Sequence, residues 1–154
     1  MIMPVLETSN GTLIQDGADI IDFFEQQAAA NNESMRLPAY PSTGVARSVA
    51  YLFELFGGEG MLRPAMHYRW NFDETNLSFL KNDFMASLFP SADVETAEKV
   101  FDFASKRMRA AAVAFGVTLE SIPLIEQSYA EFLDLFSTHL KSAPYLLGGR
   151  PTIG

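Results

Sequence analysis

The amino-acid sequence predicts an α+β protein in which a short β-hairpin and a helix precede an all-α helical bundle. Two apolar stretches on either side of an Asn-Gly pair predict the hairpin near the beginning of the chain. Apolar residues recur at helical spacing over most of the remaining sequence. A polar junction rich in Asn and Pro, near residues 30–42, separates the two parts. We therefore expect a mixed part, a linker and a helical domain.

The predicted hairpin covers residues 4–14. Its strands, Val5–Thr8 and Thr12–Ile14, flank Asn10-Gly11, a pair that readily adopts the positive φ angles of a type I′ turn. The pattern therefore predicts two antiparallel strands joined by a tight turn.

A short helix, roughly residues 16–29, is expected after the hairpin. Asp16 can accept hydrogen bonds from the free amides of a first helical turn. The apolar residues that follow it at helical spacing are Ile20, Ile21, Phe23 and Phe24. This combination of a cap and an apolar face predicts the start of the helix at Asp16.

Beyond the junction, apolar residues mark successive helices of an antiparallel bundle. The first contains Val45 and Phe56, and Gly57-Gly58 is expected to close it in a left-handed cap. A longer helix is expected to end at Gly116. The later helices are marked by the apolar residues of 77–88, 94–115 and 122–140.

Composition excludes several classes of function. The 19 acidic residues against 11 basic ones give a net charge of -8, which repels phosphate backbones and anionic lipid headgroups. We therefore expect neither nucleic-acid binding nor a membrane partner. The absence of cysteine fits a reducing compartment, so we expect a cytoplasmic protein. Two histidines without an HExxH spacing predict no metal site.

Motifs stand at both ends of the chain. The first, residues 3–24, combines Met3-Pro4 with paired strands, an acidic residue and a short helix. The second, residues 145–154, reads Tyr-Leu-Leu-Gly-Gly-Arg-Pro-Thr-Ile-Gly. Together they resemble the glutathione transferase-like superfamily, whose helical domain carries the signature Tyr-Leu-x-Gly-x-x-Pro-Thr-x-Ala-Asp. Thr152 matches the Thr of the helix cap in that signature.

The resemblance implies how the chain is divided. Residues 1–29 match the end of a thioredoxin-like domain, 30–42 a linker, and 43–154 an all-helical domain truncated at its core helix. The residue that activates glutathione's thiol in this superfamily, a Tyr, Ser or Cys, stands in an opening β-α-β unit that we expect upstream of this chain. We therefore assign no catalytic residue here.

The resemblance also implies a binding site for glutathione as co-substrate, beginning with Met3 and Pro4. Pro4 matches the superfamily's cis-proline, so the backbone of Met3 would pair with the cysteinyl part of glutathione. The alternative is an ordinary trans proline that starts an edge strand, because cis bonds are uncommon even before proline.

Gln15 and Asp16 complete the implied glutathione site. They match a Glu/Gln-Ser pair at a helix N-terminus, where free amides attract the γ-glutamyl carboxylate. Asp16 stands in the place of Ser, and its carboxylate would repel that of the ligand. The alternative is that Asp16 serves only as a helix cap.

A pocket for the electrophile is predicted from Tyr51, Leu55, Met66 and His67. His67 lies in a basic and aromatic stretch, residues 63–70, that fits the edge of an interdomain pocket. The alternatives are an irregular connection covering the bundle for this stretch, and core positions for the large apolar residues.

Two functions follow from these expectations. The first is an enzyme that binds glutathione and transfers it to, or uses it to reduce, a small electrophile, as a homodimer. The second is a non-catalytic binding or scaffold module on the same fold, which Asp16 in the place of Ser favours. The acceptor and the class of transferase are not determined by the sequence.

Overall fold

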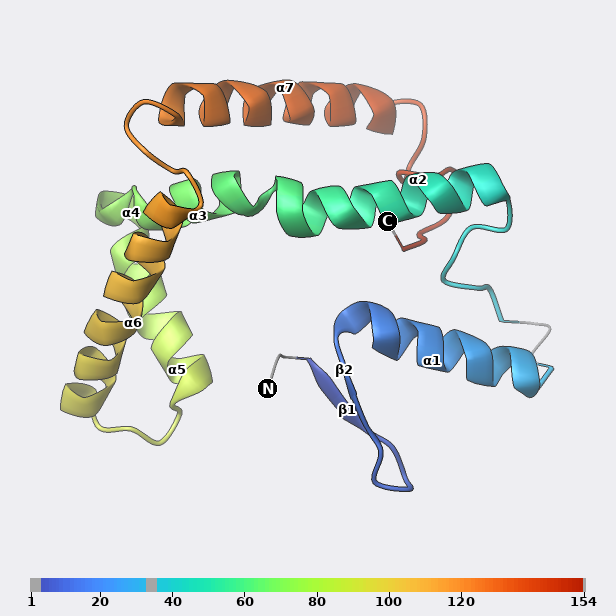
Figure 1. Cartoon of the computed structure of the whole chain (residues 1–154), viewed down its shortest axis with the longest axis horizontal. Coiled ribbons are helices and arrows are strands. Elements are labelled where there is room, and N and C mark those ends of the chain that lie inside the picture. Colours follow the sequence, from blue (N-terminus) through green and yellow to red (C-terminus); the bar gives the residue numbers. More distant parts are fainter. Residues whose placement is uncertain (1–3, 33–35, 154) are drawn as a thin grey trace. The chain divides into compact units, whose positions relative to one another are not determined.

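The chain forms two compact units (Figure 1). The computed structural model describes residues 4–32 and 36–153. The N-terminal unit combines Met1–Glu54 with Leu140–Gly154, and the central unit is Leu55–His139. The described residues are mostly helical with one two-stranded antiparallel sheet, which confirms the α+β class. The division into a thioredoxin-like part, a linker and a helical domain stays a prediction.

Strands β1 (Val5–Glu7) and β2 (Leu13–Gln15) form the predicted hairpin in the N-terminal unit. They pair antiparallel, with Leu6 opposite Ile14. One face of this ribbon is half-buried, because both of these central residues are partly covered.

The turn of the hairpin differs from the expected type I′ turn. The Thr8 amide donates to the Thr12 carbonyl at 3.0 Å, which leaves a loop of residues 9–11. Gly11 alone in that loop has a positive φ, 82°, whereas a type I′ turn needs positive φ at both central residues. The Asn10 Oδ1 accepts from the Thr12 amide at 3.1 Å and from the Thr8 hydroxyl at 2.5 Å. These side-chain bonds stabilise the wider loop.

Helix α1 (Gly17–Ala30) begins directly after Asp16, as predicted. The Asp16 Oδ1 accepts a hydrogen bond from the Ala18 amide at 2.9 Å. Ile20 and Ile21 are half-buried on the helix. The predicted start of this helix is therefore confirmed, whereas Phe24, which was assigned to the same apolar face, is exposed.

Side-chain and backbone hydrogen bonds fasten later parts of the N-terminal unit together. The Tyr40 hydroxyl donates to Asp22 Oδ1 on α1 at 2.6 Å. The Ile153 amide donates to the Ala39 carbonyl at 2.9 Å. The Arg150 guanidinium donates to the Tyr40 carbonyl at 3.4 Å. The end of the chain thus lies beside residues 39 and 40, within the predicted linker.

Helix α2 (Gly44–Leu55) does not end at Gly57-Gly58, so that prediction is wrong. A π-helical segment, η1 (Phe56–Gly60), follows it directly, and α3 (Leu62–Trp70) comes next. The expected cap needs a left-handed residue, and neither glycine has a positive φ. Residues 63–70, for which an irregular connection was the alternative, lie within α3 and are helical.

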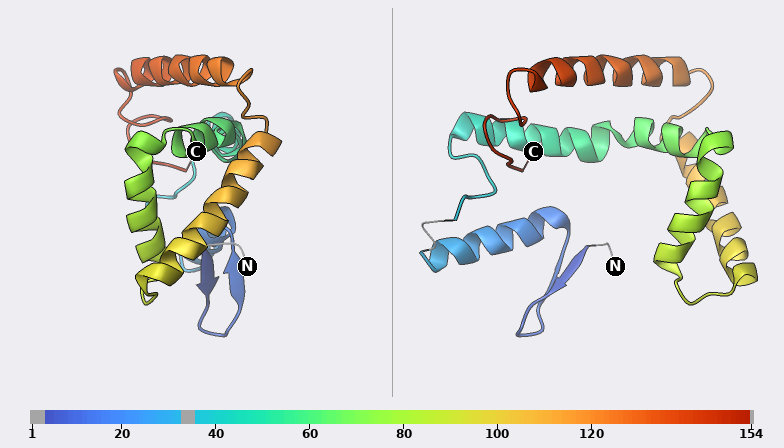
Figure 2. Two further views of the ribbon diagram at one scale, coloured as in Figure 1. Left: turned by 90° about the vertical axis from the view of Figure 1, so that its left-hand side faces the viewer. Right: turned by 180° about the vertical axis from the view of Figure 1, so that it is seen from behind.

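The two longest helices of the central unit agree with the predicted ranges, whereas the stretch expected as one helix over 77–88 begins at Asp73 and includes a π-helical segment. Gly116, at a φ of 89°, follows the end of α6 as expected. Figure 2 shows the α4 to α5 segment and α6 as the antiparallel arms of a helical hairpin. The elements are α4 (Asp73–Phe79), the π-helical η2 (Leu80–Phe84), α5 (Met85–Leu88), α6 (Val94–Ala114) and α7 (Ile122–Leu140).

Aromatic contacts join α7 to the segments that precede it in the central unit. The rings of Tyr68 and Tyr129 lie 5.3 Å apart, and those of Phe56 and Phe132 also lie 5.3 Å apart. Tyr68 follows Phe56 in the sequence, but its partner Tyr129 precedes Phe132. The segment from η1 to α3 and helix α7 therefore run antiparallel. The antiparallel packing agrees with the predicted bundle.

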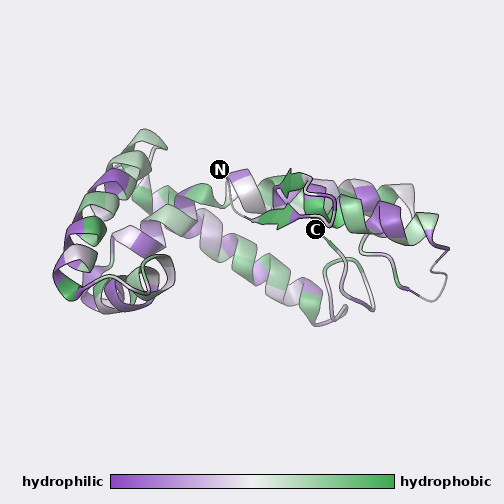
Figure 3. Cartoon of the chain, turned by 90° about the horizontal axis from the view of Figure 1, so that it is seen from below, coloured by the Kyte–Doolittle hydropathy of each residue, from purple (hydrophilic) through white to green (hydrophobic). Residues whose placement is uncertain are grey.

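A hydrophobic cluster forms the core of the central unit. Apolar and polar stretches alternate along the helices (Figure 3), which is typical of helices that bury one face. No helix within residues 4–32 and 36–153 is long and apolar enough to cross a membrane. The buried members of the cluster are Met66, Trp70, Leu80, Met85, Phe101, Ala112, Val117 and Ile125.

Candidate functional site

The N-terminal unit brings the predicted glutathione-binding residues Pro4, Gln15 and Asp16 together. The Asp16 amide donates to the Pro4 carbonyl at 3.2 Å, and Gln15 pairs with Val5 across the hairpin. All three predicted residues are exposed. Met3, the fourth, lies outside the described residues. The arrangement is an open surface at the start of α1.

The backbone of Asp16 is strained. Its φ of 81° and ψ of 142° lie in a region that L-residues other than glycine rarely adopt. Hydrogen bonds hold it on both sides: its carbonyl accepts from the Ile20 amide at 3.1 Å, and its carboxylate accepts from the Ala18 amide. The carboxylate therefore already occupies one of the amides that an anionic ligand would use.

The residues predicted for an electrophile pocket fall in both units. Tyr51 belongs to the N-terminal unit, where its ring lies 5.8 Å from that of Tyr40. Leu55, Met66 and His67 belong to the central unit. Met66 is part of the hydrophobic cluster, which agrees with the alternative of a core position. A shared pocket of all four stays a prediction.

His67 is held by hydrogen bonds on both ring nitrogens. The Asn71 amide nitrogen lies 2.9 Å from Nδ1, and Glu126 Oε1 lies 2.8 Å from Nε2. Because the amide N–H donates to Nδ1, the ring proton sits on Nε2 and is donated to the carboxylate. His67 is buried on α3, so it positions the C-terminal end of that helix against α7.

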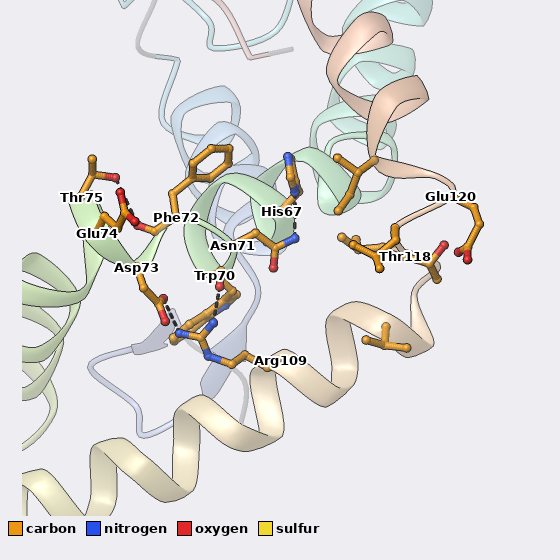
Figure 4. A pocket seen from close by; sticks show the side chains of 14 residues that line it. His67, Trp70, Asn71, Phe72, Asp73, Glu74, Thr75, Arg109, Thr118 and Glu120 are labelled. Atoms are coloured by element: carbon orange, nitrogen blue, oxygen red, sulfur yellow. Dashed lines mark hydrogen bonds and ion pairs between the residues drawn. The ribbon is translucent and has the colours of Figure 1, made fainter.

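A cavity of about 870 Å³ lies in the central unit, where α3 ends, α4 begins, and the connection from α6 to α7 passes (Figure 4). Its aromatic lining comes from Trp70 and Phe72, and its apolar lining includes Val113, Val117 and Ile122. Sequence analysis singled out only His67 and the stretch around Trp70 for this region. The lining residues from Arg109 onward are distant from this stretch in sequence and share no motif with it.

Arg109, on α6, ties one wall of the cavity together. Its guanidinium donates to the Trp70 carbonyl and to Asp73 Oδ1, the latter at 2.5 Å. It also lies over the Trp70 ring, with Cζ 5.5 Å from the centroid, a favourable cation–π position. Arg109 therefore fixes the junction of α3 and α4 against α6.

The cavity lining is acidic on balance. Asp73, Glu74 and Glu120 stand against the single guanidinium of Arg109. A hydrogen bond from the Thr118 side chain lowers the pKa of Glu120 below its ordinary value, so this carboxylate is charged at neutral pH. The field in the cavity therefore favours cations.

The comparisons with known proteins give no family. No family model, curated protein or solved structure matches this chain. Within the described part of the chain, no three His, Cys, Asp or Glu side chains gather in a way that suits a metal ion. Function therefore has to be argued from the geometry of the two sites and from the sequence motifs.

Proposed function

We propose that this chain is part of a glutathione transferase-like protein of the cytoplasm. The protein binds glutathione beside Pro4 and Asp16 and transfers it to, or uses it to reduce, a small electrophile. The thiol-activating residue belongs to a segment upstream of this chain, and the active form is a homodimer. The hairpin and the helix that follows it support the proposal, because they are the local structures that the resemblance requires.

The observation that carries the proposal is the backbone of Asp16. A non-glycine residue in such a conformation costs about 1–3 kcal/mol, and such residues cluster at ligand sites. The strained residue is bonded to the Pro4 carbonyl and stands at the start of α1. The amides of Gly17 and Asp19 belong to the first turn, where helices have no internal partner for the N–H groups. An anionic group can bind there.

A non-catalytic scaffold is the second candidate, and the Asp16 side chain favours it. The carboxylate occupies the Ala18 amide at 2.9 Å. It also places a negative charge where the glutamyl carboxylate of glutathione would bind, and like charges at that range repel. A protein that has abandoned glutathione would tolerate this arrangement.

Calorimetric titration with reduced glutathione separates the two candidates. The protein that contains this chain is compared with its Asp16→Asn and Asp16→Ser variants. Asn keeps the shape of the cap and tolerates a positive φ, but it removes the charge. For a transferase we expect saturable binding that Asp16→Asn tightens by about three- to tenfold at low salt.

Glu7→Gln is the matched control, because it removes an exposed carboxylate of the hairpin away from the start of α1. It should leave the affinity unchanged. Binding by the Asn or Ser variant alone supports the scaffold. No saturable binding by any of the three forms overturns the proposal of a glutathione site.

A further inference from the structure

We propose that the cavity beside Trp70 binds an organic cation with an apolar body, such as an aromatic or alkyl ammonium compound. The cavity measures about 870 Å³, within the range of about 300–1,000 Å³ that is typical of small-molecule sites. All of its lining residues belong to the central unit. The site is therefore separate from the glutathione site proposed for the N-terminal unit.

The charges of the lining select a cation. Arg109 is the group that would attract an anion, but its guanidinium is engaged by Asp73 and by a backbone carbonyl. Among the described residues, no Lys or Arg forms an ion pair with Glu74 or Glu120. Their two charges therefore remain for a ligand.

The two glutamates line the cavity from different elements. Figure 4 shows Glu74, on α4, at one side of the cavity and Glu120, in the connection between α6 and α7, at the other. A cation between them gains attraction from both sides, whereas a carboxylate or phosphate would be repelled by both. Charge complementarity therefore excludes the anionic ligand that Arg109 alone would suggest.

Aromatic rings suit the same ligand. Phe72 is partly exposed, and Tyr68 stacks on it with ring centroids 5.7 Å apart and an interplanar angle of 10°. Phe72 can offer a ring to a cation, whereas the Trp70 ring is buried and already lies under the Arg109 guanidinium. Val113, Val117 and Ile122 line the rest and match an apolar body. The combination of carboxylates, rings and aliphatic groups defines the ligand class.

The chain contains its own reporter for this site. Trp70 is the single tryptophan of the sequence and is 2% exposed. A quencher free in solution therefore reaches it poorly, whereas a quencher bound in the cavity lies beside it. N-benzylpyridinium is a suitable probe, because its pyridinium ring quenches indole fluorescence on contact. 3-Benzylpyridine is the matched neutral compound at pH 8, and 4-benzylbenzoate is the matched anion.

We expect saturable quenching of Trp70 by N-benzylpyridinium, with displacement by benzyltrimethylammonium, which does not quench. The cation should bind about tenfold more tightly than the neutral compound, because it alone gains the carboxylate and cation–π terms. Calorimetric titration with the matched anion, 4-benzylbenzoate, should show no binding. Equal affinity for cation and neutral compound, or quenching that rises linearly without saturation, would overturn the proposal.

Variants locate the binding in the cavity. Glu74→Gln and Glu120→Gln should each weaken cation binding by about three- to tenfold, because each removes one nearby charge. Both residues are exposed, so the variants should keep the helical circular dichroism spectrum. Glu131→Gln, which removes an exposed carboxylate bonded only by Gln127 at 2.8 Å in the described structure, should leave affinity unchanged. If Glu131→Gln weakens cation binding as much as the other two variants, the effect is one of net charge alone, and the proposed site is wrong.

Discussion

At the scale of single residues, Asp16 combines a cost and a gain. Its backbone is strained at a φ of 81°, while its side chain caps α1 through the Ala18 amide. The two contributions oppose each other, so they can be separated by two substitutions at one position. The outcome bears on local stability and is independent of glutathione binding.

Asp16→Ala and Asp16→Gly form a matched pair that differs by one methyl group. Alanine loses the cap and keeps a Cβ in the left-handed region, so we expect a loss of about 2 kcal/mol in the local stability of α1. Glycine loses the cap but removes the strain, so the two changes should cancel to within about 0.5 kcal/mol. Amide hydrogen exchange along α1 measures both. Equal effects of the two variants would show that the strain is absent in solution.

Tyr40 is the second residue with a testable consequence. Burial, followed by the hydrogen bond to Asp22, raises the pKa of its hydroxyl well above the ordinary tyrosine value. Because the folded-state pKa is the higher one, the contribution of Tyr40 to stability is complete below pH of about 10 and is lost as the pH rises further. Ionisation of this group therefore opposes folding.

An alkaline titration followed by tyrosinate absorbance tests this shift. We expect Tyr40→Phe to remove only the part of the absorbance increase that appears at the highest pH. In urea, where the chain is unfolded, the same substitution should remove absorbance from the ordinary range near a pH of about 10. If Tyr40→Phe instead removes tyrosinate absorbance that appears in the ordinary pH range of the folded protein, the Tyr40 hydroxyl is not buried against Asp22.

At the scale of elements, η1 shows how glycines behave in a helical segment. A Cβ added at Gly57 or Gly58 would meet no atom within 4 Å. One added at Gly60 would lie 2.6 Å from Phe56 Cδ2, and the Phe56 ring packs on Phe132. The same substitution therefore has opposite consequences within one short element.

Gly57→Ala and Gly58→Ala should each stabilise the protein by about 0.5–1 kcal/mol, because alanine loses less backbone entropy than glycine in a helical conformation. Gly60→Ala should destabilise it, because the Phe56 ring has to move away from Phe132. Urea unfolding followed by Trp70 fluorescence measures all three changes. Equal stabilisation by all three variants would contradict the close approach of Phe56 to Gly60.

At the scale of the whole molecule, many large apolar side chains are exposed. Leu119 is 86% exposed, Val94 78% and Leu135 73%. Exposed apolar surface of this extent favours association, since burying it removes the cost of its hydration. We expect the isolated chain to form concentration-dependent oligomers in sedimentation velocity experiments. A single monomeric species over a wide range of concentrations would contradict this prediction.

The sequence predicted most elements because their signals are local. An Asn-Gly pair marked the hairpin, Asp16 marked the start of α1, and Gly116 marked the end of α6. It failed at Gly57-Gly58, because a glycine pair is compatible with either a cap or a continued helix. Packing of η1 and α3 in the central unit decides between the two, and no local signal reports that packing.

The candidate sites divide in the same way. Pro4 and Asp16 were predicted as site residues from the family resemblance, and the register of the hairpin brings them together in the structure. The cavity was not found, because Arg109 reaches Asp73 across 36 positions of the chain. The sequence by itself determined the hairpin, the start of α1 and the end of α6, since these depend on neighbouring residues. Only the tertiary structure decided which charges and rings share a cavity, because that depends on how helices distant in sequence pack.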